Sequence, residues 1–210
     1  MKAKALLFDM DGVIVNNDAF HHLAFQEFCR KKGFELSDSD YKTKVIGGTN
    51  EQIMQRLFPG ITLTEASALG EEKEAIYREL FAPHCQPTAG LIDLLKEAQT
   101  LDIPCGLGTN GPFSNIDFVL DTCGIRPYFS AIVNAAMVVK GKPAPDVYLA
   151  LAQALGASPA DCIIFEDSNT GIQAANAAGI PVVALTTTHA QENLLPASHY
   201  MKDFTSFSLK

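Results

Sequence analysis

The chain has 210 residues, of which 47% are hydrophobic, and a formal charge of −8 at pH 7. This length suits one sizeable core with a small second unit. The acidic balance excludes a nucleic-acid surface, because no stripe of Lys and Arg is present to displace counterions from a phosphate backbone. No run approaches the roughly 18 apolar residues that cross a membrane, and the apolar run after Lys4 ends at Asp9, too soon for the core of a secretion signal. We expect a cytoplasmic monomer with no membrane partner.

The cysteines do not form a disulfide or zinc pattern. They are odd in number, widely spaced and contain no Cys-x-x-Cys pair, which argues against both. We expect them to serve as small apolar residues, several of them in core segments: Cys29, Cys85, Cys105, Cys123 and Cys162.

Short apolar runs alternate with amphipathic helical patterns along the chain. Nearly continuous apolar character is typical of strands that are covered on both faces, and such runs span 4–8, 104–107, 131–133, 162–165 and 181–185. Helical spacing follows at 91–101, 116–123, 146–155 and 170–178. Repeated strand–helix–strand order predicts an α/β fold with a Rossmann-like parallel sheet and right-handed crossovers.

Residues 17–83 interrupt this alternation. They contain no convincing strand, and apolar residues recur at helical spacing from Phe20 to Phe28, over 49–58 and over 64–81. We predict a core domain of residues 1–16 and 84–210, with residues 17–83 inserted as a small helical domain. The prolines of 82–87 disfavour continued helix at its exit. An insert tethered at two points beside the first strand could close over a site there.

Two aspartates follow the first predicted strand. Asp9 and Asp11 are two residues apart, so they point to the same side where the strand ends, and Gly12 follows at once. Two like charges about 4 Å apart repel by about 4 kcal/mol at an effective dielectric constant of about 20. A cation, a shared proton or phosphate chemistry would explain them, but an exposed turn with two solvated aspartates fits the isolated motif as well.

The ends of the later strands also carry polar groups, and ligands in open parallel sheets bind at such ends. Thr109 and Asn110 lie in a glycine-rich stretch, Gly106–Gly111, where a hydroxyl and backbone N–H groups suit phosphate oxygens, although an ordinary turn would look the same. Lys142 precedes a proline-stiffened turn and could equally be a solvated charge. The acidic pair Glu166–Asp167 follows the fourth strand and could equally be solvated acids at a helix start.

Taken together, these groups indicate a site for phosphate chemistry. Carboxylates from Asp9, Asp167 and Glu166 are hard ligands that suit Mg²⁺, and the ion would offset their crowding. Lys142 and Thr109 would hold an anion. A magnesium ion, a lysine and hydroxyl donors around an aspartate are the components of phosphoryl transfer.

In order and spacing these motifs resemble the haloacid dehalogenase superfamily of phosphotransferases. The match includes Asp9-Met10-Asp11-Gly12 after the first strand, Thr109 after the second, the turn from Lys142 to Asp146, and Glu166-Asp167. The helical insert is like the cap domain of the subgroup that contains sugar-phosphate phosphatases and β-phosphoglucomutases. The resemblance covers nearly the whole chain.

The resemblance implies a role for each motif residue. Asp9 would be the nucleophile that forms an aspartyl-phosphate, and Asp11 the general acid and then the general base. Mg²⁺ would be bound by Asp9, the backbone carbonyl of Asp11 and Asp167, with Glu166 as a ligand or a support. Thr109 and Lys142 would hold the phosphoryl group, with Asn110 beside them on the substrate. Asp11 also argues against a dehalogenase, because a departing halide needs no proton.

Two residues of the insert are candidate substrate contacts. His21 lies at the position of a histidine that reaches the active site in mutase-like members, with Asp18 beside it, although a solvated or capping role is the alternative; His22 is assigned to structure. Asn50, in the stretch Gly47–Glu51, stands where similar mutases carry an arginine. Without that cation, a second phosphate would lack a bidentate partner.

We therefore expect a Mg²⁺-dependent phosphatase acting on a small phosphorylated metabolite, a sugar phosphate. A β-phosphoglucomutase-type mutase is the alternative, and a non-catalytic protein that binds a phosphorylated ligand is a further one. The retention of both Asp9 and Asp11 disfavours the last.

Overall fold

A computed structural model describes residues 3–46 and 48–209. The chain forms two compact units, one of Met1–Asn16 with Cys85–Lys210 and the other of Asn17–His84. The second unit therefore includes His84, which the sequence assigned to the first, because a 3₁₀ turn over Ala82–His84 directly continues the last helix of the insert.

A six-stranded parallel sheet forms the centre of the first unit, in the order β3-β2-β1-β4-β5-β6. This confirms the predicted α/β class. The strands span Ala5–Phe8 (β1), Cys105–Thr109 (β2), Phe129–Asn134 (β3), Cys162–Glu166 (β4), Val182–Leu185 (β5) and His199–Met201 (β6). The sequence missed β6, because it has only three residues and begins with the exposed His199.

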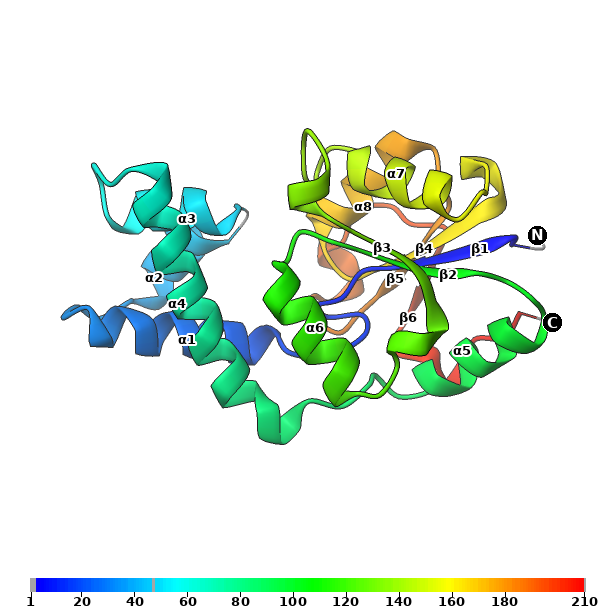
Figure 1. Cartoon of the computed structure of the whole chain (residues 1–210), viewed down its shortest axis with the longest axis horizontal. Coiled ribbons are helices and arrows are strands. Elements are labelled where there is room, and N and C mark those ends of the chain that lie inside the picture. The colour runs from blue at the N-terminus through cyan, green and yellow to red at the C-terminus, as the bar shows by residue number, and fades with distance from the viewer. Residues whose placement is uncertain (1–2, 47, 210) are drawn as a thin grey trace. The chain divides into compact units, whose positions relative to one another are not determined.

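Helices cover both faces of this sheet (Figure 1). The helices α7 (Asp146–Ala154) and α8 (Asn169–Ala178) lie on one face. The other face is covered by α5 (Leu91–Thr100), which precedes β2 in the chain, and α6 (Phe113–Thr122), which follows it. Short 3₁₀ turns occur at Arg126–Tyr128, Ala135–Met137, Pro159–Asp161, Gln191–Asn193 and Phe204–Ser206.

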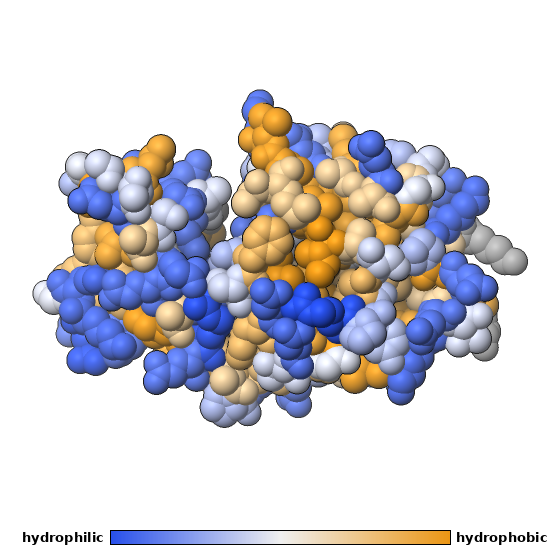
Figure 2. Space-filling view, viewed as in Figure 1, coloured by the Kyte–Doolittle hydropathy of each residue, from blue (hydrophilic) through white to orange (hydrophobic). Residues whose placement is uncertain are grey.

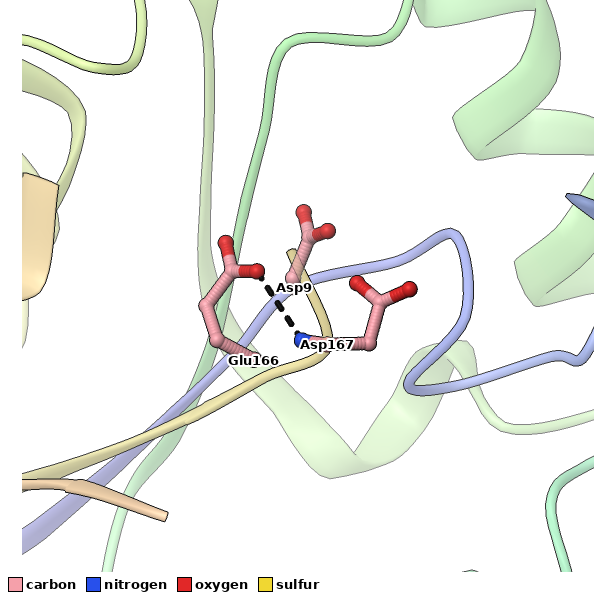
Figure 3. Close-up of side chains that lie close together, drawn as sticks. All are labelled: Asp9, Glu166 and Asp167. Carbon is pink, nitrogen blue, oxygen red and sulfur yellow. Dashed lines mark hydrogen bonds between the residues drawn. The ribbon is translucent and has the colours of Figure 1, made fainter. Parts of the chain in front are cut away.

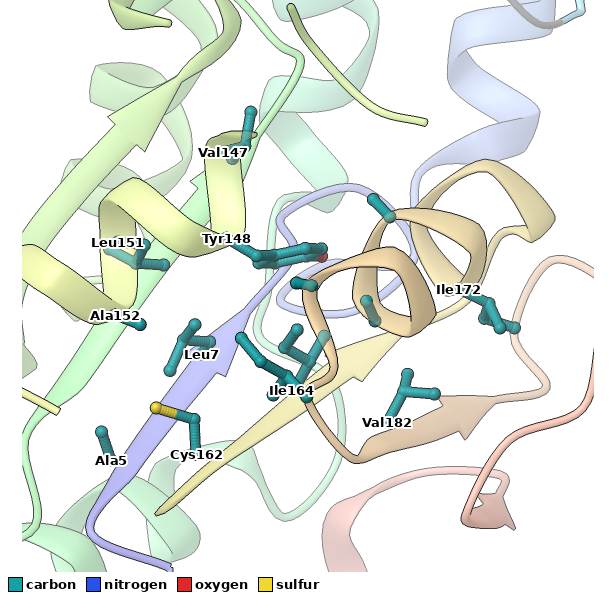
Figure 4. Packing of buried hydrophobic residues seen from close by; sticks show 14 of the residues in the cluster. Ala5, Leu7, Val147, Tyr148, Leu151, Ala152, Cys162, Ile164, Ile172 and Val182 are labelled. Atoms are coloured by element: carbon teal, nitrogen blue, oxygen red, sulfur yellow. The ribbon is translucent and has the colours of Figure 1, made fainter. Parts of the chain in front are cut away.

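The alternation of side chains along β1 and β4 builds a core on each face. Leu7 and Ile164 belong to a buried cluster with residues of α7 and α8, including Tyr148 (Figure 4). On the other face, the ring of Phe8 stacks on Phe165, with centroids 4.8 Å apart. Both faces of these strands are thus buried, which is why their sequences are almost uniformly apolar.

Strand β2 extends further than its sequence predicts. The glycine-rich stretch was expected to leave the strand after Leu107, but pairing with β3 continues to Thr109, which lies opposite Asn134. A Cβ on Gly106 would lie 2.7 Å from Leu151 of α7, so the glycine lets this helix pack closely on the strand. Thr109 therefore ends a strand, where its position is fixed by the sheet.

The second unit is helical in its described residues. Its elements are α1 (Asp18–Lys31), α2 (Asp38–Asp40), a π-helical turn (Tyr41–Val45), α3 (Asn50–Leu57) and α4 (Leu63–Phe81). Both α3 and α4 begin with capping boxes, at Thr49 and Thr62. Hydrophilic residues predominate on the face of α1 and α4 seen in Figure 2, as expected for helices whose apolar sides pack within the insert.

Candidate active site

Three buried carboxyl groups meet at the carboxyl ends of the two central strands. Asp9 follows β1, Glu166 ends β4 and Asp167 follows it, and β1 and β4 are neighbours in the sheet. Each residue offers a carboxylate oxygen, and these oxygens lie within 4.8 Å of one another (Figure 3). Parallel pairing therefore brings together residues that are more than 150 positions apart in the chain. This is expected for polar groups at the carboxyl ends of neighbouring parallel strands.

The ammonium group of Lys142 lies among these acids. Its Nζ donates hydrogen bonds to Asp9 Oδ1 at 2.8 Å, to Glu166 Oε1 at 2.7 Å and to the Tyr148 hydroxyl at 2.7 Å. The Lys142 side chain is only 4% exposed. A buried ammonium with three acceptors is held in one position, because each alternative position would leave a charge unpaired.

The electrostatics of the cluster favour binding of a further cation. Burial raises the pKa of Asp9 to about 7, opposed by Lys142 and reinforced by Glu166 and Asp11. Burial and the neighbouring Glu166 and Asp9 also raise the pKa of Asp167 well above its usual value. Burial alone would lower the pKa of Lys142, but the charges of Asp9 and Glu166 outweigh it and raise that pKa. One lysine thus leaves the acidic cluster with uncompensated charge.

The donor set fits a hard divalent cation such as Mg²⁺, which prefers carboxylate oxygens. The two oxygens of Glu166 already accept five hydrogen bonds, from Lys142, Tyr148, the Asp167 N–H and both the N–H and the hydroxyl of Ser168. From the described residues, Asp9 accepts a side-chain hydrogen bond from Lys142, and Asp167 accepts one from Thr188. Asp9 and Asp167 therefore retain more oxygen lone pairs for an ion than Glu166 does.

The turn after Asp9 is held against Asp167. Gly12 has a φ of +76°, and a Cβ there would lie 1.9 Å from Asp167 Oδ2, so only glycine fits. The Thr187 hydroxyl donates to the Gly12 carbonyl at 2.5 Å, and the adjacent Thr188 hydroxyl donates to Asp167. These two threonines after β5 therefore fix the turn that carries Asp11.

Thr109 and Asp11 approach the same point. The Thr109 hydroxyl oxygen accepts a hydrogen bond from the Gly111 N–H at 2.9 Å, which directs its own hydrogen elsewhere. A Cβ on Gly111 would lie 3.3 Å from Thr109 Oγ1 and 3.7 Å from Asp11 Oδ2, so both side chains border this glycine. Thr109 is buried, and Asp11 is partly exposed.

Asn110 contacts the backbone of Lys142 with both ends of its amide. Its Oδ1 accepts from the Lys142 N–H at 2.9 Å, and its Nδ2 donates to the Lys142 carbonyl at 3.1 Å. Asn110, a predicted substrate contact, thus also positions the backbone of Lys142. The peptide bond between Lys142 and Pro143 is cis.

Within the second unit, His21 and Asn50 belong to one polar cluster. The ring of His21 stacks on Tyr77 at 3.8 Å between centroids, and its Nδ1 lies 3.4 Å from Lys73 Nζ. Asn50 Nδ2 donates to Glu74 Oε1 at 2.8 Å, and this carboxylate also accepts from Lys73 at 2.6 Å. Lys73 and Glu74 are almost fully buried. The ring of His22 instead packs against the ring of Tyr41, with centroids 4.0 Å apart. Asp18 is the first residue of α1 and is exposed. Gly47 lies outside the described residues.

The family model of haloacid dehalogenase-like hydrolases matches residues 6–185, which include all the predicted site residues. The chain belongs to this family. Among its relatives, validoxylamine A 7'-phosphate phosphatase of Streptomyces hygroscopicus subsp. limoneus is 32% identical over 96% of this chain and 94% of its own. The fructose-1-phosphate phosphatase YqaB of Escherichia coli (strain K12) is 34% identical over 85% of this chain and 94% of its own.

A solved structure shares the fold. The crystal structure of β-phosphoglucomutase from Clostridium difficile has a TM-score of 0.84 and 26% identity, and covers 98% of this chain and 93% of its own. The chain is accordingly an enzyme of the haloacid dehalogenase-like hydrolases with relatives named as phosphatases. No helix in the described part of the chain is long and apolar enough to span a membrane.

Several residues of the two polar clusters, one in each unit, carried no signal in the sequence. Tyr148 lies within an apolar helical pattern, yet its hydroxyl donates to Glu166 Oε1 at 2.6 Å. Thr188 is one of three consecutive threonines, just beyond the range that the family model matches. Lys73 and Glu74 fall in a charged stretch of α4 that suggests a solvated face. Only the three-dimensional arrangement distinguishes these residues from ordinary core and surface positions.

Proposed function

We propose that this haloacid dehalogenase-like hydrolase is a Mg²⁺-dependent phosphatase that hydrolyses a sugar phosphate through an aspartyl-phosphate on Asp9. The observation that supports this most is the buried ammonium of Lys142, which is bonded to Asp9 Oδ1 in a pocket of acids. An aspartate that the Lys142 ammonium holds at a strand end suits attack on a phosphoryl group.

In the first step, a carboxylate oxygen of Asp9 forms a bond to phosphorus while the bond from phosphorus to the ester oxygen breaks. Asp11 gives a proton to that oxygen, so that an alcohol departs in place of an alkoxide. Lys142 and Thr109 donate hydrogen bonds to the phosphoryl oxygens, where negative charge accumulates.

In the second step, Asp11 takes a proton from water, and the water oxygen attacks phosphorus. The bond between phosphorus and the Asp9 oxygen breaks, and inorganic phosphate leaves. When bound by Asp9 and Asp167, Mg²⁺ would supply positive charge that offsets both the acidic cluster and the phosphate. Glu166 keeps Lys142 and the Asp167 backbone in place through the bonds described above.

The substrate class rests on two kinds of support. The two phosphatase relatives are named for a validoxylamine phosphate and a fructose phosphate, and the second of these is a sugar phosphate. In this proposal, residues 17–83 act as a cap over the core of residues 1–16 and 84–210, and His21 and Asn50 meet the part of the substrate beyond the phosphate. The cluster around them offers amide, imidazole, ammonium and carboxylate groups, which suit sugar hydroxyls.

The surroundings of Asn50 favour hydrolysis over phosphoryl transfer between two positions of a sugar. A mutase needs a cation for the second phosphate of its bisphosphate intermediate. Asn50 is neutral and bonds to Glu74, and the adjacent Lys73 is already paired with this carboxylate. This cluster therefore binds a second phosphate less strongly than an arginine would.

A panel of phosphorylated sugars and polyols, assayed for phosphate release with Mg²⁺ and with a chelator, tests the proposal. We expect Mg²⁺-dependent release from at least one of them. Conversion of β-glucose 1-phosphate to the 6-phosphate with a bisphosphate primer, in place of phosphate release, would instead identify a mutase. Binding of the panel without turnover would identify a non-catalytic protein.

A further inference from the structure

Two cysteines of the first unit, distant in sequence, lie side by side. Cys85 Sγ is 3.7 Å from Cys123 Sγ, although 38 positions separate the residues. Neither residue takes part in the proposed phosphatase reaction. The spacing gives no Cys-x-x-Cys motif and predicts two small apolar residues, yet neither is fully buried.

The backbone around this pair allows the sulfurs to meet. They must approach by about 1.7 Å to reach the length of a disulfide bond. Cys123 caps the end of α6, where its N–H donates to the Val119 carbonyl and the next N–H, of Gly124, donates to the Asp121 carbonyl, so the backbone around Cys123 is held. Cys85 lies in an irregular segment between a 3₁₀ turn and Pro87, so it can supply the movement. Both residues belong to the first unit, so the bond would not cross-link this unit to the helical insert.

The chemistry of this pair differs from that of the other three cysteines. The hydrogen bond between the two thiols lowers the pKa of Cys123, and the same bond together with burial raises the pKa of Cys85. Burial raises the pKa of Cys29 to about 11 and that of Cys105 to about 12, and it also raises the pKa of Cys162. Thiolate character and access to solvent therefore coincide at Cys123.

We propose that Cys85 and Cys123 form a reversible redox site that a low-molecular-weight disulfide, such as oxidised glutathione, converts to an intramolecular disulfide. The Cys123 thiolate attacks one sulfur of the oxidant, the oxidant's S–S bond breaks, and one thiolate leaves. Cys85 then gives its proton to solvent and attacks the Cys123 sulfur, which expels the second thiolate. The two cysteines are oxidised, and one disulfide is reduced to two thiols.

The bond would join the first residue after the insert to the end of α6. The closed loop from 85 to 123 contains α5, β2 and the residues Thr109 and Asn110. Cross-linking this loop restricts the unfolded chain, so the oxidised protein is expected to unfold at a higher temperature than the reduced one. This inference does not depend on the proposed phosphatase activity.

The test uses the whole wild-type chain at low concentration, incubated with oxidised glutathione, alkylated and digested for peptide mapping. We expect a peptide that links Cys85 to Cys123, a fall from five alkylated cysteines to three, and restoration of five by dithiothreitol. Five alkylated cysteines after oxidation, a persistent glutathione adduct on either residue, or a link that involves another cysteine or a second chain would overturn the proposal.

Two variants sharpen the result. Cys85→Ser removes the resolving thiol, so glutathione should remain attached to Cys123. Cys162→Ser is the matched control, because it removes a buried cysteine that lies outside the pair, and the link should form as in the wild type. Failure of Cys85→Ser to retain glutathione on Cys123 would contradict the order of attack and with it the proposal.

Discussion

The Lys142 ammonium lies 2.8 Å from the carboxylate of Asp9, which is 133 positions away in the chain. Both groups are buried, so the pair is far more strongly coupled than an exposed ion pair would be. The same ammonium bonds to Glu166, and the family's first and later motifs are thereby joined into one network.

Lys142→Met should reduce kcat/KM by about 10² to 10³, because it removes a preorganised hydrogen-bond donor from the phosphoryl site. The substitution keeps most of the side-chain volume, and steady-state phosphate release measures its effect. Lys140→Met is the matched control: Lys140 is exposed and two positions away, and kcat/KM should not change. Equal effects of the two substitutions would remove Lys142 from the site.

Tyr148→Phe should lower the free energy of unfolding by about 1.5–3 kcal/mol, because it removes one hydroxyl that bonds to two charged groups. A smaller fall in kcat than for Lys142→Met should accompany it, since Lys142 keeps its carboxylate partners. Urea denaturation and steady-state kinetics measure the two effects. Tyr128→Phe serves as the control, since no partner for the Tyr128 hydroxyl is found among the described residues. An unchanged free energy of unfolding in Tyr148→Phe would mean that the buried hydroxyl does not stabilise the network.

Stabilisation of the protein by Mg²⁺ should grow with pH. The folded pKa of Asp9, about 7, exceeds its ordinary value of 3.8, so the folded protein binds a proton more tightly than the unfolded chain. Without a metal, the contribution of Asp9 to stability is therefore lost as the pH rises from about 4 to about 7. Mg²⁺ competes with that proton and stabilises the folded state by about 2.7 kcal/mol at 100 times its Kd.

Thermal unfolding at about pH 5 and about pH 8, with and without Mg²⁺, measures this difference. The shift in Tm should be larger at the higher pH and should be lost in Asp167→Asn, which removes a proposed ligand. A shift of equal size at both pH values, or one that survives in Asp167→Asn, would contradict the assignment of these carboxylates to the metal.

Asp11→Asn should slow turnover by about 10² to 10⁴, because the amide cannot exchange protons with the leaving group or water. An aryl phosphate, whose phenolate leaves without a proton, should still phosphorylate this variant. The phosphoenzyme should then accumulate, since its breakdown needs the base, and intact-mass spectrometry after rapid quenching detects it. Wild-type rates on both alkyl and aryl substrates would exclude Asp11 as the acid and base.

The sequence predicts the sheet and the main site residues because both depend on local patterns. Buried parallel strands are apolar throughout, which marks them in the sequence. Ligand groups follow the carboxyl ends of such strands, so the sequence predicts Asp9, Lys142 and Glu166 as site residues. The structure confirms the α/β class and brings these three side chains into direct contact.

Other features depend on contacts between distant residues and leave no local trace. Tyr148 has the spacing of a core residue, and only the approach of α7 to β4 shows that its hydroxyl reaches Glu166. Both ends of the Asn110 amide bond to the backbone of Lys142, 32 positions later in the chain. The residues next to Asn110 in the sequence do not indicate these two bonds. The pairing of Cys85 with Cys123 likewise depends on how the segment after the insert packs beside α6.

The most direct test of the account is the rate of Mg²⁺-dependent phosphate release by Asp9→Asn, compared with the wild type on the best substrate of the panel. The account predicts a folded protein, shown by an unchanged circular dichroism spectrum, with no measurable turnover, because an amide oxygen cannot form the aspartyl-phosphate. Phosphate release by Asp9→Asn at a rate near that of the wild type would contradict the role of Asp9 as the nucleophile.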